Sequence, residues 1–159
     1  MNTGAPGNEK CYTILHVDHD LTELARLRVT LGRFPHLRCL SSPCALIGLE
    51  IARFRHPDLI LLDVDSPAVD LAGMLAELGR DPRTQDIPVI AVSADHVGPL
   101  AAMLHAADDD GHHPYETPGH PPAGGLCGIL RKPLSDTKLL RILGSACRPH
   151  ALRQGQAEA

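Results

Sequence analysis

The sequence predicts an α/β domain in which five parallel strands form one doubly wound sheet with helices on both faces. Short apolar runs alternate along the chain with amphipathic segments of helical spacing. The run Leu59–Leu62 has no polar alternation, which is typical of a central parallel strand covered on both faces. Strands that alternate with helices imply right-handed crossovers and therefore a parallel sheet. A length of 159 residues suits one domain.

The first third of the chain predicts two strands and two helices. Tyr12–Val17 is the first strand, and Asp20 can cap the helix after it, with Glu23 placed as in a capping box. The apolar stripe of this helix is formed by Leu21, Leu24, Leu27 and Leu31. His36–Leu40 is the second strand. Ser42-Pro43 favours the start of a second helix that runs to about Arg55. Its expected inward residues are Ala45, Leu46, Leu49 and Ala52.

The central strand lies between Pro57 and Ser66-Pro67 and ends on Asp63. A third helix is predicted over Val69–Leu78, with inward positions Leu71, Met74, Leu75 and Leu78. Ile87–Val92 is predicted as the fourth strand, and Pro99–Ala107 as a short fourth helix.

The segment Asp108–Gly125 interrupts this alternation, because its Asp, His, Pro and Gly content is that of a loop or a disordered stretch. Leu126–Leu130 resumes as the fifth strand, and Ser135 caps a last helix with Leu139, Ile142, Leu143 and Ala146 inward. We therefore expect one domain at 11–147 with an insertion at about 108–125. A disordered N-terminal tail at 1–10 and a flexible C-terminal tail at 148–159 flank it.

Composition excludes several classes of function. The net charge of −4 gives no basic surface for direct nucleic-acid binding. No stretch has the length and apolarity of a membrane span or a secretory signal, so we expect a cytoplasmic protein without membrane partners. The five cysteines are odd in number and contain no C-x-x-C pair, which favours free, mostly buried thiols over a metal or disulfide role.

Polar residues gather where the predicted strands end: Asp18-His19-Asp20, Asp63-Val64-Asp65, Ser93 and Lys132. The carboxyl ends of parallel strands meet at one edge of a sheet, where ligands bind. Carboxylates there would favour Mg²⁺, and a metal ion with a lysine would neutralise phosphoryl oxygens. An aspartate can itself be the nucleophile and become an aspartyl phosphate.

Four segments carry a family resemblance: I-L-H-V-D-H-D, P-D-L-I-L-L-D-V-D-S-P, D-P-R-T-Q-D-I-P-V-I-A-V-S-A and R-K-P-L. In this order, each at or just after a predicted strand, they resemble the response-regulator receiver domain (CheY-like) of two-component signalling. The resemblance runs from about Tyr12 to Cys147, apart from the insertion. It implies a flavodoxin-like sheet with strand order 2-1-3-4-5.

The resemblance also implies roles for the strand-end residues. Asp63 would accept a phosphoryl group from a histidine kinase or phosphotransfer protein. Asp18 and Asp63 would hold Mg²⁺, with the backbone carbonyl of Asp65, whose side chain we expect to act only in a turn. Ser93 would be the switch hydroxyl, and Lys132 would pair with the phosphoryl group. Such a protein is not an enzyme beyond its own phosphorylation and dephosphorylation, and it signals to a downstream protein target, with a homodimer through the last helices as a further option.

Several residues depart from the family's pattern. His19 replaces the second of two adjacent acids, and an imidazole is a poor Mg²⁺ ligand, so we predict weak Mg²⁺ binding. Ile129 stands at the aromatic switch position, and Asp70-Leu71 replaces an Asp-Gly. His16 lies within the first strand and is expected to be a satisfied core or edge histidine rather than a ligand.

Two other functions and one other site stay open. A pseudo-receiver, which binds partners without phosphorylation, is favoured by His19 and Ile129. A haloacid-dehalogenase-type phosphatase shares the hydrophobic-D-x-D pattern at Leu59–Asp65, but here Ser66-Pro67 follows in place of Gly-Thr. A transition-metal site in the insertion is another option, although the spacing of its acids and histidines matches no fixed ligand pattern. The residues concerned are Asp108–Asp110, His112, His113, Glu116 and His120.

Overall fold

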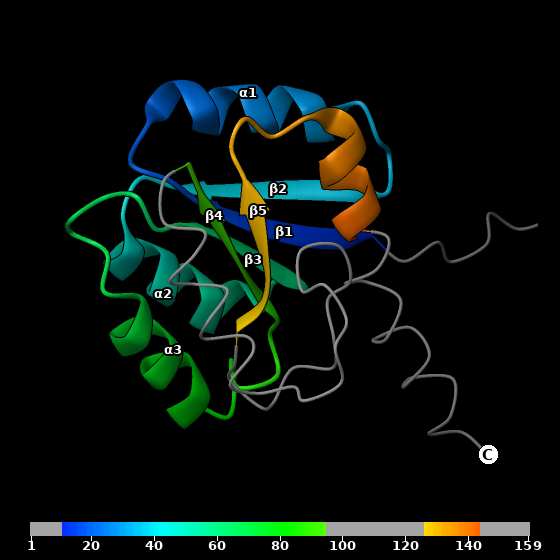
Figure 1. Ribbon diagram of the computed structural model, residues 1–159. Coiled ribbons are helices and arrows are strands. Elements are labelled where there is room, and N and C mark those ends of the chain that lie inside the picture. The colour runs from blue at the N-terminus through cyan, green and yellow to red at the C-terminus, as the bar shows by residue number, and fades with distance from the viewer. Residues whose placement is uncertain (1–10, 95–125, 144–159) are drawn as a thin grey trace, which may run out of the picture.

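The computed structural model describes residues 11–94 and 126–143. These residues form a five-stranded parallel sheet in the order β2-β1-β3-β4-β5 (Figure 1). The strands are β1 (Tyr12–Val17), β2 (Leu37–Ser42), β3 (Leu59–Asp63), β4 (Val89–Ser93) and β5 (Leu126–Arg131). The predicted α/β class and the strand order 2-1-3-4-5 are therefore confirmed.

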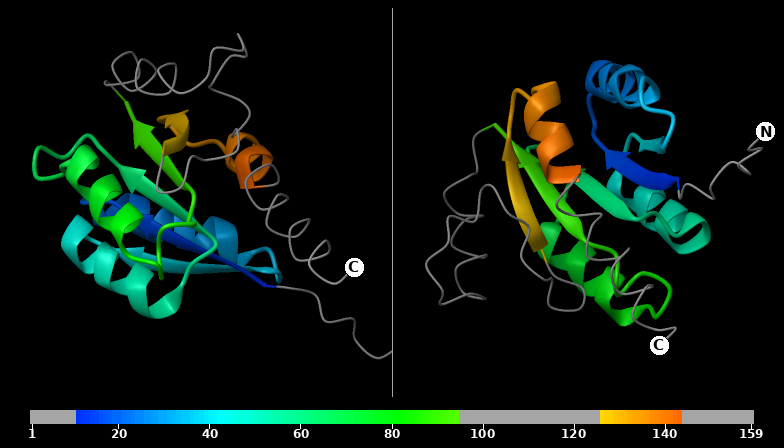
Figure 2. Two further views of the ribbon diagram at one scale, coloured as in Figure 1. Left: turned by 90° about the horizontal axis from the view of Figure 1, so that it is seen from below. Right: turned by 90° about the vertical axis from the view of Figure 1, so that its right-hand side faces the viewer.

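Helices cover both faces of the sheet, as Figure 2 shows from two directions. The helices with described bounds are α1 (Leu21–Gly32), α2 (Ala45–Arg55) and α3 (Leu71–Arg80), and residues 136–143 form a last helix. Buried leucines of α1 and of the last helix share one core with Leu59 and Leu61 of the central strand. The opposite core joins α2 and α3 to Ile60 and Leu62. Alternate residues of β3 thus point into opposite cores, which explains why its sequence is apolar throughout.

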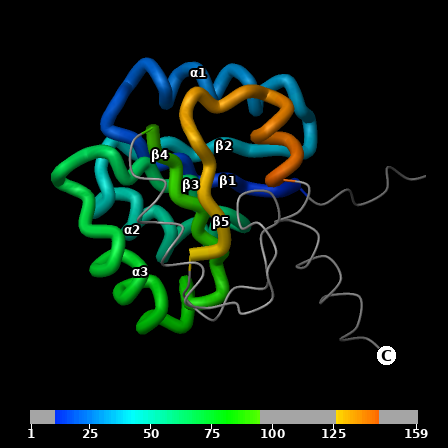
Figure 3. The backbone as a smooth tube through the Cα atoms, in the orientation of Figure 1, coloured from blue at the N-terminus to red at the C-terminus, as the bar shows by residue number. Residues whose placement is uncertain are grey.

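The chain changes direction across the sheet between β1 and β3. Figure 3 traces it from β1 through α1 to the edge strand β2, and then back through α2 to β3 on the other side of β1. The connection after β1 leads to β2 on one side, and the connection after β3 leads to β4 on the other side. Neighbouring strands whose connections lead in opposite directions form a topological switch point, where α/β sheets bind ligands. The residues that follow β1 and β3 therefore lie where a site is expected.

Several local predictions are confirmed. Asp20 caps α1, because its side chain accepts a hydrogen bond from the backbone N–H of Thr22. The hydroxyl of Ser135 accepts a hydrogen bond from the backbone N–H of Lys138 at 3.2 Å, which is the expected cap of the last helix. Leu139, Ile142 and Leu143 are buried as predicted.

Other local predictions are wrong. The backbone N–H of Asp20 donates to the Asp18 carboxylate, and Glu23 pairs with Arg26, so α1 has no capping box. Ser42 continues β2, and α2 starts later, at Ala45, after the cap position Cys44, whose side chain makes no capping bond. Leu21 of α1 and Leu46 of α2, which were predicted to face the core, are exposed.

The described cysteines form no disulfide, as expected, but they are not mostly buried. Cys127 is buried and Cys39 half-buried, whereas Cys11 and Cys44 are exposed. The predicted helix Pro99–Ala107, the insertion at about 108–125, both tails, Ala146 and Cys147 lie outside the described residues. Within the described ranges, no helix has the length and apolarity needed to cross a bilayer.

Candidate functional site

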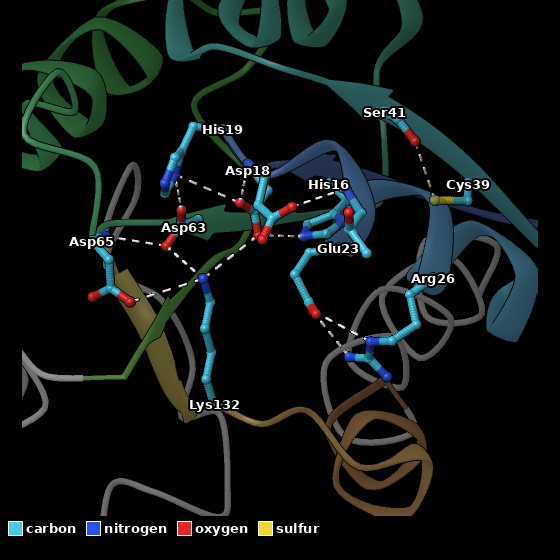
Figure 4. Close-up of polar contacts among 12 residues, drawn as sticks. His16, Asp18, His19, Glu23, Arg26, Cys39, Ser41, Asp63, Asp65 and Lys132 are labelled. Atoms are coloured by element: carbon cyan, nitrogen blue, oxygen red, sulfur yellow. Dashed lines mark hydrogen bonds and ion pairs between the residues drawn. The ribbon is translucent and has the colours of Figure 1, made fainter.

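Strand ends bring Asp18, Asp63 and Lys132 together at one edge of the sheet, as predicted (Figure 4). Ser93, at the end of β4, joins them through its hydrogen bond to Asp65. The parallel register explains this convergence, because Val17 pairs with Leu62, Asp63 with Val92 and Ser93 with Arg131. Each strand therefore ends at nearly the same level, and the residues that follow share one small volume. The Lys132 ammonium lies among three carboxylates, 3.1 Å from Asp63 Oδ1, 3.6 Å from Asp18 Oδ2 and 3.8 Å from Asp65 Oδ2.

Asp63 is a buried carboxylate with several hydrogen-bond partners. It is the last residue of β3 and is 1% exposed. Its Oδ1 accepts hydrogen bonds from Lys132 Nζ and from the backbone N–H of Asp65, both at 3.1 Å. Its Oδ2 lies 2.7 Å from His19 Nδ1. These contacts fix the orientation of the Asp63 carboxylate.

Asp18 is equally buried but less completely paired. It is 2% exposed, and its Oδ1 accepts the backbone N–H of Asp20 at 2.9 Å. Its Oδ2 is buried and has no hydrogen-bond partner among the described residues. Burial raises the pKa of Asp18, but contacts with His16 and the Asp20 N–H and the Lys132 charge outweigh it and lower that pKa to about 2. Asp18 therefore presents an anionic oxygen with unused capacity to bind a cation.

Lys132 remains a cation in this setting. Burial lowers its pKa, but the hydrogen bond to Asp63 and the charges of Asp18, Asp63 and Asp65 raise it by more, so the net pKa lies above its ordinary value. The ammonium therefore supplies a permanent positive charge next to Asp63.

The side chain of Asp65 does more than we predicted from the sequence. It accepts a hydrogen bond from Ser93 Oγ at 2.5 Å and another from the backbone N–H of Ala94 at 2.8 Å. The expectation that this side chain acts only in its turn is wrong, because it ties the end of β4 to the loop after β3. Ser93 itself is fully buried at the end of β4.

His19 points into the site rather than away from it. Its Nδ1 lies 2.7 Å from Asp63 Oδ2 and 3.7 Å from Asp18 Oδ1, while its side chain is 53% exposed. Ligand atoms of Asp18, His19 and Asp63 all lie within 4.8 Å of one another, a grouping that could hold a metal ion. The buried Asp18 carboxylate, one oxygen of which has no hydrogen-bond partner among the described residues, fits a divalent cation at this place.

His16 lies behind Asp18 on β1 and is 1% exposed. Its Nε2 is 3.6 Å from Asp18 Oδ2, slightly beyond hydrogen-bond length, and neither ring nitrogen has a hydrogen-bond partner among the described residues. His16 is thus a core histidine, as predicted, but not a satisfied one. Ile129, at the position that the resemblance assigns to an aromatic switch, is a buried core residue.

Sequence reasoning missed the Asp65 carboxylate and the contact of His16 with Asp18. The only sequence signal for either was position: Asp65 stands two residues after the end of β3, and His16 two residues before Asp18. Alternation along a strand places His16 on one face of β1, but its distance from Asp18 depends on how the chain turns after Val17.

Comparisons of the sequence with known proteins find distant, partial relatives. No protein-family model matches the chain. PilH of Pseudomonas aeruginosa is 32% identical over 80 residues, which cover 50% of this chain and 65% of PilH. The polar-differentiation response regulator DivK of Brucella ovis is 45% identical over 49 residues, which cover 31% of this chain and 40% of DivK. The chain thus spans less than two thirds of the length of either relative.

Solved structures share the fold across most of the chain. A response regulator receiver domain protein from Clostridium thermocellum has a TM-score of 0.69 at 19% identity, covering 89% of this chain and 98% of its own. The chemotaxis response regulator CheY4 of Vibrio cholerae has a TM-score of 0.66 at 17% identity, covering 86% of this chain and 99% of its own.

Proposed function

We propose that this chain is a response-regulator receiver domain, which accepts a phosphoryl group on Asp63 and signals through contacts with other proteins; its fold and its distant relatives support this. The observation that carries the proposal is the pairing of Asp63 with Lys132 at 3.1 Å, beside a second buried carboxylate, Asp18, one oxygen of which has no hydrogen-bond partner among the described residues. A receiver domain is a signalling module rather than an enzyme.

The residues divide the chemistry among them. Asp63 attacks phosphorus, a P–O bond forms, and the bond from phosphorus to the nitrogen of the donor phosphohistidine breaks, leaving imidazole that takes up a proton. Lys132 is placed to neutralise an oxygen of the transferred group. Asp18, Asp63 and the backbone carbonyl of Asp65 would hold a divalent ion, which supplies further charge neutralisation when bound.

Ser93 and Asp65 offer a route from the phosphoryl group to the surface. Ser93 Oγ donates to Asp65 in the unphosphorylated chain. A phosphoryl oxygen next to Lys132 is a stronger acceptor for this hydroxyl than a carboxylate that already accepts the Ala94 N–H. Transfer of the hydroxyl from Asp65 to the phosphoryl group would break one of the two hydrogen bonds that tie the end of β4 to the loop after β3, which is the switch role that we propose for Ser93.

The expected partners follow from this function. A sensor histidine kinase or a phosphotransfer protein would supply the phosphoryl group, and a downstream protein would read the phosphorylated state. A homodimer through the last helices is a further option for the readout. We propose no direct nucleic-acid contact, because the chain has a net charge of −4.

The second candidate is a pseudo-receiver that keeps the fold without the chemistry. The observation in its favour is His19, whose Nδ1 lies 2.7 Å from Asp63 Oδ2 and so covers one oxygen of the acceptor. Ile129 adds to it, since an isoleucine packed in the core cannot rotate as an aromatic switch does.

Intact-protein mass spectrometry after incubation with acetyl phosphate and Mg²⁺ or Mn²⁺ separates the two candidates. The receiver predicts one phosphate adduct that hydroxylamine removes, and Asp86→Asn, which changes an exposed aspartate, keeps it. The pseudo-receiver predicts no adduct with either ion. Sustained turnover of a generic phosphate ester would instead point to a phosphatase.

A further inference from the structure

The donor atoms at this site are of two chemical kinds. Asp18 and Asp63 offer carboxylate oxygens, and His19 offers an imidazole nitrogen, with all of these atoms within 4.8 Å of one another. Cis ligands of an ion with bonds near 2.1 Å lie about 3 Å apart. The 2.7 Å from His19 Nδ1 to Asp63 Oδ2 and the 3.7 Å to Asp18 Oδ1 bracket that spacing. Small side-chain adjustments would therefore bring all three atoms around one ion.

A second observation indicates that a cation belongs here. Asp18 Oδ2 is buried without a hydrogen-bond partner among the described residues. The groups that approach it, Lys132 Nζ and His16 Nε2, both remain 3.6 Å away. An anionic oxygen that is removed from water and not fully paired costs free energy. A divalent ion bound to the Asp18 carboxylate would offset the cost of burying its charge.

From these two observations we propose that the site selects a first-row transition ion, such as Mn²⁺ or Zn²⁺, over Mg²⁺, with His19 as the selecting ligand. Mg²⁺ prefers oxygen ligands and holds its water strongly, whereas transition ions gain affinity from imidazole nitrogen. The inference rests on the same pocket as the proposed function, but it does not require phosphorylation.

The surroundings of His19 permit this role. Its side chain is 53% exposed, so the ring can adjust while Asp18 and Asp63, each 1% exposed at the side chain, stay fixed. Coordination through Nδ1 uses the tautomer that carries its hydrogen on Nε2. The ion then lies between Nδ1 and Asp63 Oδ2, where the free protein has a hydrogen bond. The metal thus replaces the contact that covers Asp63, and it leaves Lys132 on the other oxygen.

The test is a Mn²⁺ titration of the unphosphorylated full chain followed by ¹⁵N NMR, with competition by Mg²⁺ and by Zn²⁺. Paramagnetic broadening localises the ion, which matters because the chain contains ten histidines. We expect the first broadened amides to be those near Asp18–Asp20 and Asp63–Asp65. The variants are wild type, His19→Asp, which restores an oxygen ligand, and His56→Asn, a control at an exposed histidine outside the site.

The expected result is that the ratio of the Mg²⁺ to the Mn²⁺ dissociation constant falls at least tenfold in His19→Asp and stays unchanged in His56→Asn. Zn²⁺ should displace Mn²⁺ from the wild type more readily than from His19→Asp. Equal ratios in wild type and His19→Asp would overturn the inference, as would broadening confined to other histidines.

The two proposals can fail separately. A selective metal site in a chain that forms no adduct with acetyl phosphate would refute the proposed function and keep this inference. A hydroxylamine-sensitive adduct, together with equal ratios of the Mg²⁺ to the Mn²⁺ dissociation constant in wild type and His19→Asp, would support the proposed function and refute this inference.

Discussion

Gly48 of α2 packs closely against β1 next to the site, and an alanine there should destabilise the protein. Gly48 is buried in α2. A Cβ at this position would lie 2.7 Å from Val17 Cγ2, 3.5 Å from Val17 Cγ1 and 3.6 Å from Ser42 Oγ. Val17 ends β1, directly before Asp18, so the clash falls at the base of the acidic site.

The size of the effect follows from two opposing contributions. Forcing an extra carbon into a packed core costs about 1–3 kcal/mol. Alanine in place of glycine in a helix interior returns up to about 1 kcal/mol. The two contributions together leave a loss of roughly 0–3 kcal/mol in the free energy of unfolding. We expect the middle of that range, about 1–2 kcal/mol, which lowers the Tm of a domain of this size by roughly 2–8 °C.

The assay is urea and thermal unfolding followed by circular dichroism. Gly32→Ala is the matched control, because a Cβ there would meet no atom within 4 Å. Val17→Ala introduced into Gly48→Ala should restore part of the loss, since it removes the carbons that clash, and the double-mutant cycle should show a favourable coupling. If Gly48→Ala proved as stable as wild type, the close contact between α2 and β1 would be refuted.

Three further predictions concern stability. His56 has a φ of 47° after α2, and His56→Gly should raise the free energy of unfolding by up to about 1 kcal/mol because glycine adopts this conformation without steric cost; a loss of stability in urea would contradict this. The fully buried Thr84 Oγ1 donates a hydrogen bond to the Leu78 carbonyl at 2.8 Å. Thr84→Val should lower the free energy of unfolding by about 1–3 kcal/mol, because it removes the donor to that carbonyl. An unchanged urea midpoint would show that the hydrogen bond contributes nothing to stability. The pKa of Asp18 in the folded protein, about 2, lies below its ordinary value of 3.8, so the stability that it contributes is present above pH 3.8 and is lost as the pH falls towards 2. Between these pH values, the free energy of unfolding should therefore depend less on pH in Asp18→Asn than in wild type. The same pH dependence in both proteins would argue against the stabilising contacts of the Asp18 carboxylate.

The strands were predictable because they carry strong local signals. Leu59–Leu62 and Ile87–Val92 are uninterrupted apart from one proline, and burial on both faces permits only apolar residues there. β2 was the least well placed, since it is an edge strand whose half-buried side chains leave a weak pattern. Its end at Ser42 was misjudged because Ser-Pro also fits a helix start, and only pairing with β1 decides between them.

The site was predictable where it depends on topology. Asp18, Asp63, Ser93 and Lys132 meet because strand ends of a parallel sheet meet, which needs only the order of elements. The Asp65 carboxylate and the direction of His19 were not predictable, because both depend on side-chain torsions in loops after the strands. Ser93 and Asp65 are 28 residues apart in sequence, and no local pattern links them.

The measurement that tests the central claim most directly is peptide mass spectrometry of the chain after incubation with acetyl phosphate and either Mg²⁺ or Mn²⁺. We predict a single hydroxylamine-sensitive phosphate on the peptide that contains Asp63, and no adduct in Asp63→Asn. An adduct on another residue, a full-yield adduct in Asp63→Asn, or no adduct with either ion would contradict the assignment of Asp63 as the phosphoryl acceptor.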